Sequence, residues 1–542
     1  MKKGSQKNIK TRKGSALVFA LVTVIIAAMT LTSLLTYISS QLHFSSDRVE
    51  RERAFQIAEA GAYYYRWYLA HQIAGKTAEQ IKDFWEDTSP YPLGVDAPVE
   101  VEYMDPESSA IGKYMLEVVK PALGSTIVIV KSTGWTYAKP SIKRVVQVRF
   151  RRPSWSENSV LADDNMRFGE GTVVTGKIHS NKGIRFDGVA NNIISSSLAS
   201  YDDLDHNDTG AEKLEFGVHT HVTAPPGSGV VDTYRPLEVP PAVVAPRTDV
   251  FQAGRTFPAP QLDFNSVVSD ISFMRSQATI KFDNTGKGRH IKLKTDGTMD
   301  VASVNSYSPY VNSFTGSNGI INYSGITIGA IGGFLATNGL PCSSFTNATT
   351  FCNTVATCNW ISNTNHNRGK CSTMTNHSIP NNGIVFVANN IWLEGTVDNK
   401  KVSFVAAELI DEPGYTGGGK SVFLGTGNLL YANSNGLADG SDIIGVIAQK
   451  NVEVIENSLD TLTLDGAFLA KEGRVGREYY GNTRNTITVN GSIATYSRYG
   501  FAYTDGTGYQ NRNINFDNNL LYYPPPYFPT GTEYAIDQWD EL

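Results

Sequence analysis

Residues 16–38 read ALVFALVTVIIAAMTLTSLLTYI, a run of 23 residues without a charged side chain. As an α-helix this run would be about 35 Å long, which is enough to cross the hydrocarbon core of a bilayer. Residues 1–13 in front of it hold six basic and no acidic side chains, and we treat residues 1–14 as a basic leader. Basic residues stay on the cytoplasmic side, so we expect a single-pass inner (cytoplasmic) membrane protein with a cytoplasmic N-terminus and an extracytoplasmic bulk.

A cleaved secretory signal is the alternative interpretation of this segment, but its apolar run would be shorter and would end in a small-x-small cleavage site. Here the run is long, and residues spaced three to four apart continue one helical face beyond it: Ala54, Ile57, Ala58, Gly61, Tyr65 and Tyr68. We therefore expect one retained long helix over residues 15–75. A helix of that length needs neighbours, either the rest of this chain or other subunits.

Two motifs in this helix resemble those of bacterial pilins. Lys13-Gly14 followed by Ser15-Ala-Leu-Val-Phe resembles a type IV prepilin leader junction, where a prepilin peptidase cuts after the glycine. Residues 54–61, AFQIAEAG, are similar to the A-x-x-A-E-A-G signature of minor pilins of the PilX kind. The resemblance implies cleavage between Gly14 and Ser15 and packing with other pilin subunits through the helix. It also implies a pilin motif formed by Ala54, Ala58, Glu59, Ala60 and Gly61.

One position departs from the pilin pattern. Most pilins have Glu at the fifth mature position, and Phe19 stands there in this chain. A carboxylate in a lipid-embedded helix bundle is costly unless it is paired. Its absence is also typical of the tip-located K pseudopilin of type II secretion, which has no subunit above it.

Residues 76–155 predict a small α+β domain, as in a pilin headgroup. Thr77-Ala-Glu-Gln80 is a capping box and predicts a short helix over 78–87. Alternating or β-branched runs predict an antiparallel meander packed against the long helix, with strands at 99–104, 114–119, 126–131 and 144–150.

The large C-terminal region, residues 156–542, differs in composition from the rest of the chain. Residues 1–150 contain one asparagine, whereas the 392 residues after them contain 38. Short apolar runs recur with glycine, as in Gly445-Val-Ile-Ala, Gly466-Ala-Phe-Leu-Ala and Gly491-Ser-Ile-Ala-Thr, 21 and 25 residues apart. This spacing favours a parallel β-helix, whose bends suit glycine and whose stacked coils let asparagine side chains bond in ladders. A β-sandwich or jelly roll is the alternative. The expected fold is therefore mainly β with a long N-terminal α-helix.

Two segments interrupt this β-solenoid. Residues 263–278 have a helical apolar face and predict a helix that covers an end or side of the solenoid. Residues 302–380 are an insertion with all four cysteines of the chain, Cys342, Cys352, Cys358 and Cys371. No C-x-x-C spacing occurs, so outside the membrane we expect two disulfides rather than a metal site or free thiols, with the pairing open.

We find no motif for catalysis, a cofactor or a metal. Asp163-Asp164 and Asp202-Asp203 are interpreted as solvated loop acids, His206 and His219-Thr-His221 as surface-loop histidines, and Arg289-His-Ile-Lys292 as only superficially similar to a polygalacturonase motif. The net charge is -5 and becomes -11 without the first 13 residues, which disfavours nucleic acid as a partner.

These features predict a structural, non-enzymatic subunit of a type IV pilus or related filament. We expect this subunit to be a minor pilin or a pseudopilin and to lie at the tip of the filament. The expected partners are the membrane, a prepilin peptidase, other pilin subunits and, on the cell surface, a surface or carbohydrate ligand. Two alternatives remain. One is a membrane-anchored carbohydrate-binding or carbohydrate-active β-helix protein, and the other is an adhesin whose cysteine-containing insertion contacts its partner.

Overall fold

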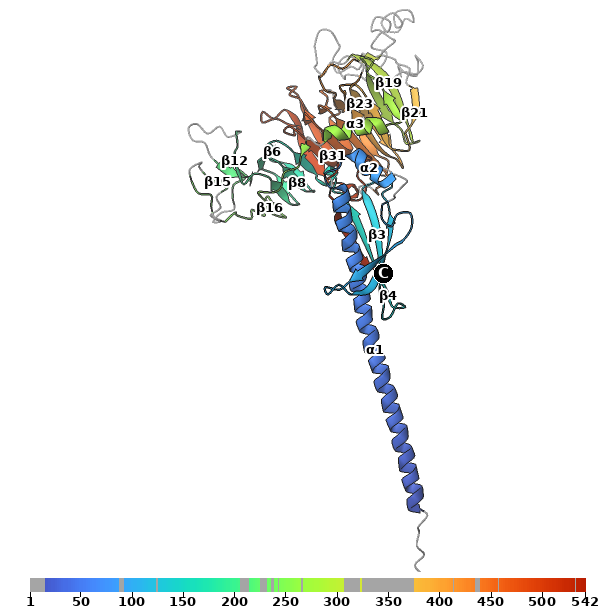
Figure 1. The fold of residues 1–542 in the computed structure, drawn as a ribbon. Coiled ribbons are helices and arrows are strands. Elements are labelled where there is room, and N and C mark those ends of the chain that lie inside the picture. Colours follow the sequence, from blue (N-terminus) through green and yellow to red (C-terminus); the bar gives the residue numbers. More distant parts are fainter. Residues whose placement is uncertain are drawn as a thin grey trace, which may run out of the picture.

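The computed structural model describes most of the chain, and the account below is limited to that part. It comprises residues 15–86, 92–122, 125–204, 214–224, 232–234, 238–241, 243–264, 267–306, 322–323, 375–412, 414–433, 439–456, 458–531 and 533–542. A long N-terminal helix leads into a small antiparallel sheet, and a large region of mainly parallel strands follows (Figure 1).

The long helix is α1, Ser15–Ile73, and its 59 residues correspond to about 88 Å. Its first half extends away from the rest of the molecule, whereas its second half packs on the small sheet (Figure 1). After α1, the predicted capping box is present: Gln80 N–H donates to Thr77 Oγ1 over 3.3 Å, and Thr77 N–H donates to Gln80 Oε1 over 3.0 Å. It begins the short helix α2, Ala78–Glu86.

The small sheet has five antiparallel strands in the order β1-β2-β3-β4-β33. They are β1 Val99–Met104, β2 Ala110–Val119, β3 Ile127–Thr136, β4 Lys143–Arg151 and β33 Ala535–Glu541. The first four form the predicted meander. Buried and less buried residues alternate along β2 and the first half of β3, because one face of the sheet packs against α1 and α2.

The fifth strand was not predicted. Residues 156–542 were expected to form one separate domain, but β33 returns from the end of the chain and pairs with β4. The pairing slips by one residue between Ile536 and Gln538, so Asp537 lies in a bulge. The Asp537 carboxylate accepts hydrogen bonds from Arg149 Nε at 2.5 Å and Arg151 Nε at 3.0 Å, which holds the last strand on the sheet. The large β region is therefore inserted between two neighbouring strands of the headgroup sheet.

The large region contains a 22-stranded sheet. Its strands are β5 Val160–Ala162, β7 Thr172–Val174, β8 Ile178–Ser180, β10 Val189–Ala190, β11 Ile194–Ser196, β16 Arg255–Thr256, β17 Ile280–Phe282, β18 Gly288–Leu293, β19 Thr298–Ser306, β20 Asn322–Tyr323, β21 Thr375–Ser378, β22 Ile384–Val387, β23 Ile391–Val397, β24 Lys401–Ala406, β25 Val422–Leu424, β26 Leu429–Tyr431, β27 Ile443–Ala448, β28 Val452–Val454, β29 Thr461–Ala470, β30 Val475–Arg477, β31 Thr483–Thr495 and β32 Gly508–Asn515.

One ladder of this sheet runs through ten parallel strands in the order β17-β22-β24-β27-β29-β31-β5-β8-β11-β16. The stacking order therefore differs from the chain order, because the late strand β31 lies beside the early strand β5. The recurring glycine-containing segments stack on one another. Gly466 pairs with Gly491, and Gly445 pairs with Ala467.

Side chains of the ladder are buried on both faces. In β27, Ile444, Val446 and Ala448 belong to the main core, while Ile443 and Ile447 belong to a second core on the other face. Helix α3, Val267–Gln277, covers this second face, as expected for the helix near 263–278. The proline-rich tail, residues 524–529, also packs there. Ser403 Oγ donates to Pro526 O at 2.5 Å, and Phe528 is buried in the second core.

Polar side chains also stack along the parallel strands. Asn515 Nδ2 donates to Asn490 Oδ1 at 2.9 Å, and Asn490 Nδ2 donates to Asp465 Oδ1 at 2.8 Å. These three residues are register neighbours on β29, β31 and β32. They form the kind of side-chain ladder that the asparagine content predicts.

Two three-stranded sheets complete the region at the end of the stack near β11. One has the order β12-β13-β15, with β12 Ser200–Asp202, β13 Leu214–Phe216 and β15 Thr233–Tyr234. The other has the order β14-β9-β6, with β6 Met166–Phe168, β9 Ile184–Phe186 and β14 Val218–His219. Figure 1 shows β12 and β15 at the opposite side of the molecule from β19 and β21.

The glycine at position 491 is required by the stacking of neighbouring strands. A Cβ at Gly491 would lie 1.8 Å from Gly466 O, and its φ is +152°. We expect Gly491→Ala to lower the free energy of unfolding of this region by at least about 2 kcal/mol. Gly500→Ala is the matched control, because a Cβ there has no atom within 4 Å, and its effect should stay within about 0.5 kcal/mol. Calorimetric unfolding of both variants checks this, and equal effects would contradict it.

Candidate functional site

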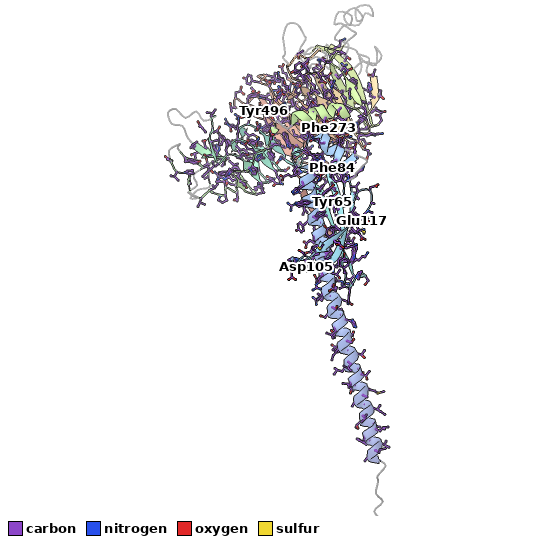
Figure 2. The ribbon with its side chains drawn as sticks, viewed as in Figure 1. Tyr65, Phe84, Asp105, Glu117, Phe273 and Tyr496 are labelled. Atoms are coloured by element: carbon purple, nitrogen blue, oxygen red, sulfur yellow. The ribbon has the colours of Figure 1, made fainter. Side chains whose placement is uncertain are left out.

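The first half of α1 exposes many large apolar side chains, among them Leu17, Phe19 and Leu42. Every side chain from residue 16 to residue 49 is exposed, and Figure 2 shows the side chains along the first part of α1 projecting from the helix away from the rest of the molecule. Among the helices that the structure describes, α1 is the one that is long and apolar enough to cross a membrane. Burying this surface requires either lipid or other protein chains.

Four threonine hydroxyls of this segment are satisfied within the helix. The hydroxyls of Thr23, Thr30, Thr32 and Thr36 donate to backbone carbonyl oxygens three or four residues earlier, at 2.7–3.0 Å. A hydroxyl without a partner would be costly in hydrocarbon, so these bonds make the segment compatible with lipid.

Glu50 marks the point where α1 enters the headgroup. It is the first buried side chain of the helix, with 7% of its surface exposed. Its carboxylate accepts hydrogen bonds from Thr136 Oγ1 at 2.5 Å and from Arg53 Nη1 at 2.9 Å. These bonds balance the cost of burying the charge and anchor the helix on the end of β3.

The pilin-like motif begins immediately after this point and packs against the sheet. Ala54 and Ala58 are fully buried and face Gly134 of β3. The approach is so close that a Cβ at Gly134 would lie 2.4 Å from both Ala54 O and Ala58 N. The small residues of the motif therefore allow the helix backbone to contact the sheet backbone.

The remaining motif residues divide between two surroundings. A Cβ at Gly61 would lie 2.3 Å from Ser132 Oγ and 2.8 Å from Tyr114 Cδ2, so the glycine permits the same close packing on β2 and β3. Glu59 and Ala60 are partly exposed on the other side of the helix. The motif thus has a packing role within the chain, and its two partly exposed residues remain accessible to a neighbour.

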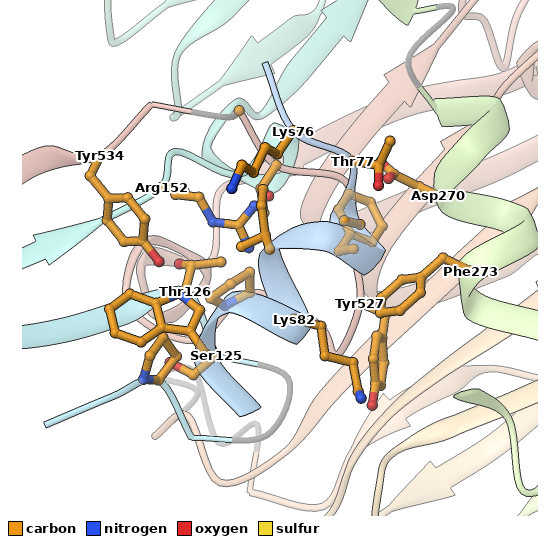
Figure 3. A pocket seen from close by; sticks show the side chains of 18 of the residues that line it. Lys76, Thr77, Lys82, Ser125, Thr126, Arg152, Asp270, Phe273, Tyr527 and Tyr534 are labelled. Carbon is orange, nitrogen blue, oxygen red and sulfur yellow. The ribbon is translucent and has the colours of Figure 1, made fainter. Parts of the chain in front are cut away.

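A cavity of about 820 Å³ lies where the headgroup meets the large β region (Figure 3). Helix α2, helix α3 and the proline-rich tail each line part of it, and Lys82, Arg152, Asp270 and Tyr527 are among its polar side chains. Burial raises the pKa of Asp270 to about 6, and the positive charge of Arg152 opposes this effect only in part. The Asp270 carboxyl therefore carries its proton more readily than an exposed aspartate.

Several residues singled out in the sequence lie outside the described part of the chain. They are Gly14, His206 and the four cysteines, Cys342, Cys352, Cys358 and Cys371. Ser15 is the first residue of α1. Leader cleavage and the disulfides therefore stay predictions.

The interpretation of the acids and histidines as exposed loop residues was wrong for two of them. Asp163, Asp164 and Asp202 are partly or fully exposed, as expected, but Asp203 is 6% exposed and His219 is completely buried. The strands β12 and β14 are too short to show a clear alternation in the sequence, so their burial could not be predicted. Asp203, His219 and His221 are also the one group of described residues whose donor atoms are close enough to share a metal ion.

The segment 289–292 is part of the parallel sheet. His290 is fully buried in β18, and its Nε2 lies 3.1 Å from Glu394 Oε1 on the neighbouring strand β23. Arg289 Nη1 donates to the backbone oxygens of Lys287 and Gly288. These contacts hold the segment within the sheet.

The solved structures that are similar to this chain include that of a pilin. It is the crystal structure of the competence-associated pilin ComZ from Thermus thermophilus, at 13% identity, covering 91% of this chain and 97% of that one. The TM-score is 0.24, and we draw nothing on fold or function from a likeness of that size. No family model and no curated protein matched the chain.

The close packing of the pilin-like motif leads to a test. We expect Ala58→Leu to destabilise the headgroup by about 1–3 kcal/mol, because the larger side chain would collide with the backbone at Gly134. Ala70→Leu is the matched control, since Ala70 is exposed on the same helix. Thermal unfolding of the detergent-solubilised protein measures both, and an unchanged melting temperature for Ala58→Leu would refute the packing argument.

The raised pKa of Asp270 predicts a pH-dependent stability. An unfolded aspartate ionises near pH 4 but the folded one near pH 6, so the unfolded chain binds fewer protons in this window and stability falls as the pH rises. At pH 7.5 we expect Asp270→Asn to stabilise the protein by about 1–3 kcal/mol, and at pH 3.5 this gain should vanish. Melting temperatures of the variant and the wild type at the two pH values test this prediction, and an equal gain at both would contradict it.

Proposed function

We propose that this chain is a structural, non-enzymatic subunit of a bacterial type IV pilus or related filament. The observation that carries the proposal is the division of α1 into two halves. Residues 16–49 are exposed and include the uncharged apolar run 16–38, whereas the second half packs against the antiparallel sheet of the headgroup. Such a helix suits a protein that is anchored in the membrane before assembly and then packs its apolar half against other subunits.

The sequence of α1 supports the same proposal. A basic leader ending in Gly14 precedes the helix, and the motif residues Ala54, Ala58 and Gly61 bring the helix onto the sheet. In this proposal a prepilin peptidase cuts before Ser15, and the freed helix packs with the helices of other pilin subunits. The orientation has the N-terminus in the cytoplasm and the headgroup outside.

We further propose that the large β region is a β-solenoid displayed by this stem. The parallel ladder of ten strands and the Asp465-Asn490-Asn515 side-chain ladder support this assignment. The region is much larger than the headgroup that carries it (Figure 1). Repeating such a bulk at every position of a filament wall would be sterically unfavourable, so a minor subunit at the tip is the best-supported position.

The N-terminal mass of the protein tests this proposal. Co-expressed with a prepilin peptidase, the chain should begin at Ser15, and without the peptidase it should begin at Met1. We expect Gly14→Val to block the cut, because a branched side chain replaces the glycine at the predicted junction. Gly4→Val, a matched change elsewhere in the leader, should leave the cut intact.

A Met1 start in the presence of the peptidase would contradict the proposal. The chain would then be a membrane-anchored protein that does not enter a filament. Carbohydrate binding by the β region would become the leading hypothesis, and a glycan array with the full chain would examine it.

A further inference from the structure

Four potential metal ligands converge at the end of the stack that carries the two small sheets. Asp203 follows β12, Glu215 lies in β13, His219 ends β14, and His221 follows two residues later. Tyr201 of β12 pairs with Glu215, and His219 pairs with Arg185 of β9. The two sheets therefore bring Asp203 close to Glu215, His219 and His221, which follow it by more than ten residues in the sequence.

The distances between the donor atoms suit a single small cation. One donor atom from each of Asp203, His219 and His221 lies within 4.8 Å of the others. His219 Nε2 is 3.6 Å from Asp203 Oδ2, and His221 Nε2 is 3.9 Å from Glu215 Oε1. In a tetrahedral zinc site with bonds of about 2.1 Å, neighbouring ligand atoms are about 3.4 Å apart. Small side-chain adjustments would therefore close the atoms of Asp203, His219 and His221 around an ion, and Glu215 Oε1, next to His221 Nε2, would be the fourth ligand.

The burial of His219 points to a ligand. Its side chain is fully buried, and its Nε2 atom makes no hydrogen bond. Leaving a buried ring nitrogen without a hydrogen bond is costly, and a metal ion would remove that cost. The other ring nitrogen, Nδ1, lies 3.3 Å from Tyr201 Oη. A hydrogen bond from Nδ1–H to this oxygen leaves Nε2 with its lone pair directed toward the other ligands.

The surrounding contacts orient the other ligands. Asp187 Oδ1 accepts a hydrogen bond from His221 N–H at 2.8 Å, and Glu215 Oε2 accepts one from Asp203 N–H at 3.2 Å. Arg185 Nε donates to Asp187 Oδ2 at 2.7 Å, and Arg185 Nη1 lies 3.9 Å from Asp203 Oδ2. The ligands are thus held on a pre-arranged framework, as in known metal sites.

The local charge also favours a cation. Asp187, Asp203 and Glu215 are carboxylates, and the charges of Arg185 and Arg498 act on the same surroundings of Tyr201. Three negative charges therefore meet two positive ones in a largely buried site. A divalent ion would offset the remaining negative charge. His221 keeps 22% of its side chain exposed, which leaves a route for the ion to enter.

We propose that Asp203, Glu215, His219 and His221 form a binding site for a divalent transition metal, with Zn²⁺ as the best fit. Two imidazoles disfavour Mg²⁺ and Ca²⁺, which prefer oxygen ligands alone, and four protein ligands suit tetrahedral zinc. The ion would link the sheet β12-β13-β15 to the sheet β14-β9-β6. Its role would be to stabilise this end of the β region, whichever filament the protein enters.

The test uses the full chain in detergent, without a histidine tag and after treatment with EDTA. Titration with Zn²⁺ should show one ion bound per chain and a higher melting temperature. His221→Gln should weaken this binding at least tenfold, because loss of an outer-shell partner alone typically costs 10–100-fold. Asp203→Asn is the second variant and should weaken it as well.

His290→Gln is the matched control, since it breaks another buried histidine–carboxylate pair, one that belongs to no group of three potential ligands among the described residues. It should leave zinc affinity unchanged. Co²⁺ absorption separates this site from the cysteines, because a site of histidines and carboxylates lacks a thiolate charge-transfer band.

Three results would overturn the proposal. Absence of binding to the wild-type chain would leave His219 and His221 as neighbours of the carboxylates without a metal. Full affinity in His221→Gln and Asp203→Asn would place the ion elsewhere. A Co²⁺ spectrum dominated by thiolate charge transfer would assign binding to the cysteines.

Discussion

The pairing of β33 with β4 is the constraint on which the rest of the structure depends. It requires the chain to leave the headgroup sheet after Arg151 and to return beside the same strand at Ala535. The backbone confirms this closeness, because Trp155 N–H donates to Pro529 O at 3.1 Å. A region of nearly 400 residues therefore begins and ends at one place.

The order of the parallel strands follows from this constraint. If the strands stacked in chain order, the first and last would lie at opposite ends of the ladder. Instead β31, one of the last strands, lies directly beside β5, the first. From β5 the chain builds one arm of the stack as far as β16, then crosses through α3 to β17 and fills the other arm back toward the middle. The crossing helix covers a face of the sheet that would otherwise expose apolar side chains.

Glycines allow close backbone contacts in both the headgroup and the large β region. At Gly134 the absence of a side chain lets α1 approach the headgroup sheet, and at Gly491 it lets one strand stack on the next. The second half of the helix therefore packs on the sheet, whereas its first half stays exposed. Membrane anchoring and filament packing, as proposed, would both depend on that uncovered half.

The sequence by itself determined the parts that rest on local patterns. The apolar run 16–38 and the capping box at Thr77 predict the helices, and alternation along residues 99–150 predicts the meander, because such signals depend on near neighbours in the chain. Recurring glycines and asparagines likewise predict parallel stacking. Only the tertiary structure decided the return of β33, the order of the stack and the burial of Asp203 and His219. These depend on contacts between residues far apart in sequence, and the strands involved are too short or too polar to show which partner they meet.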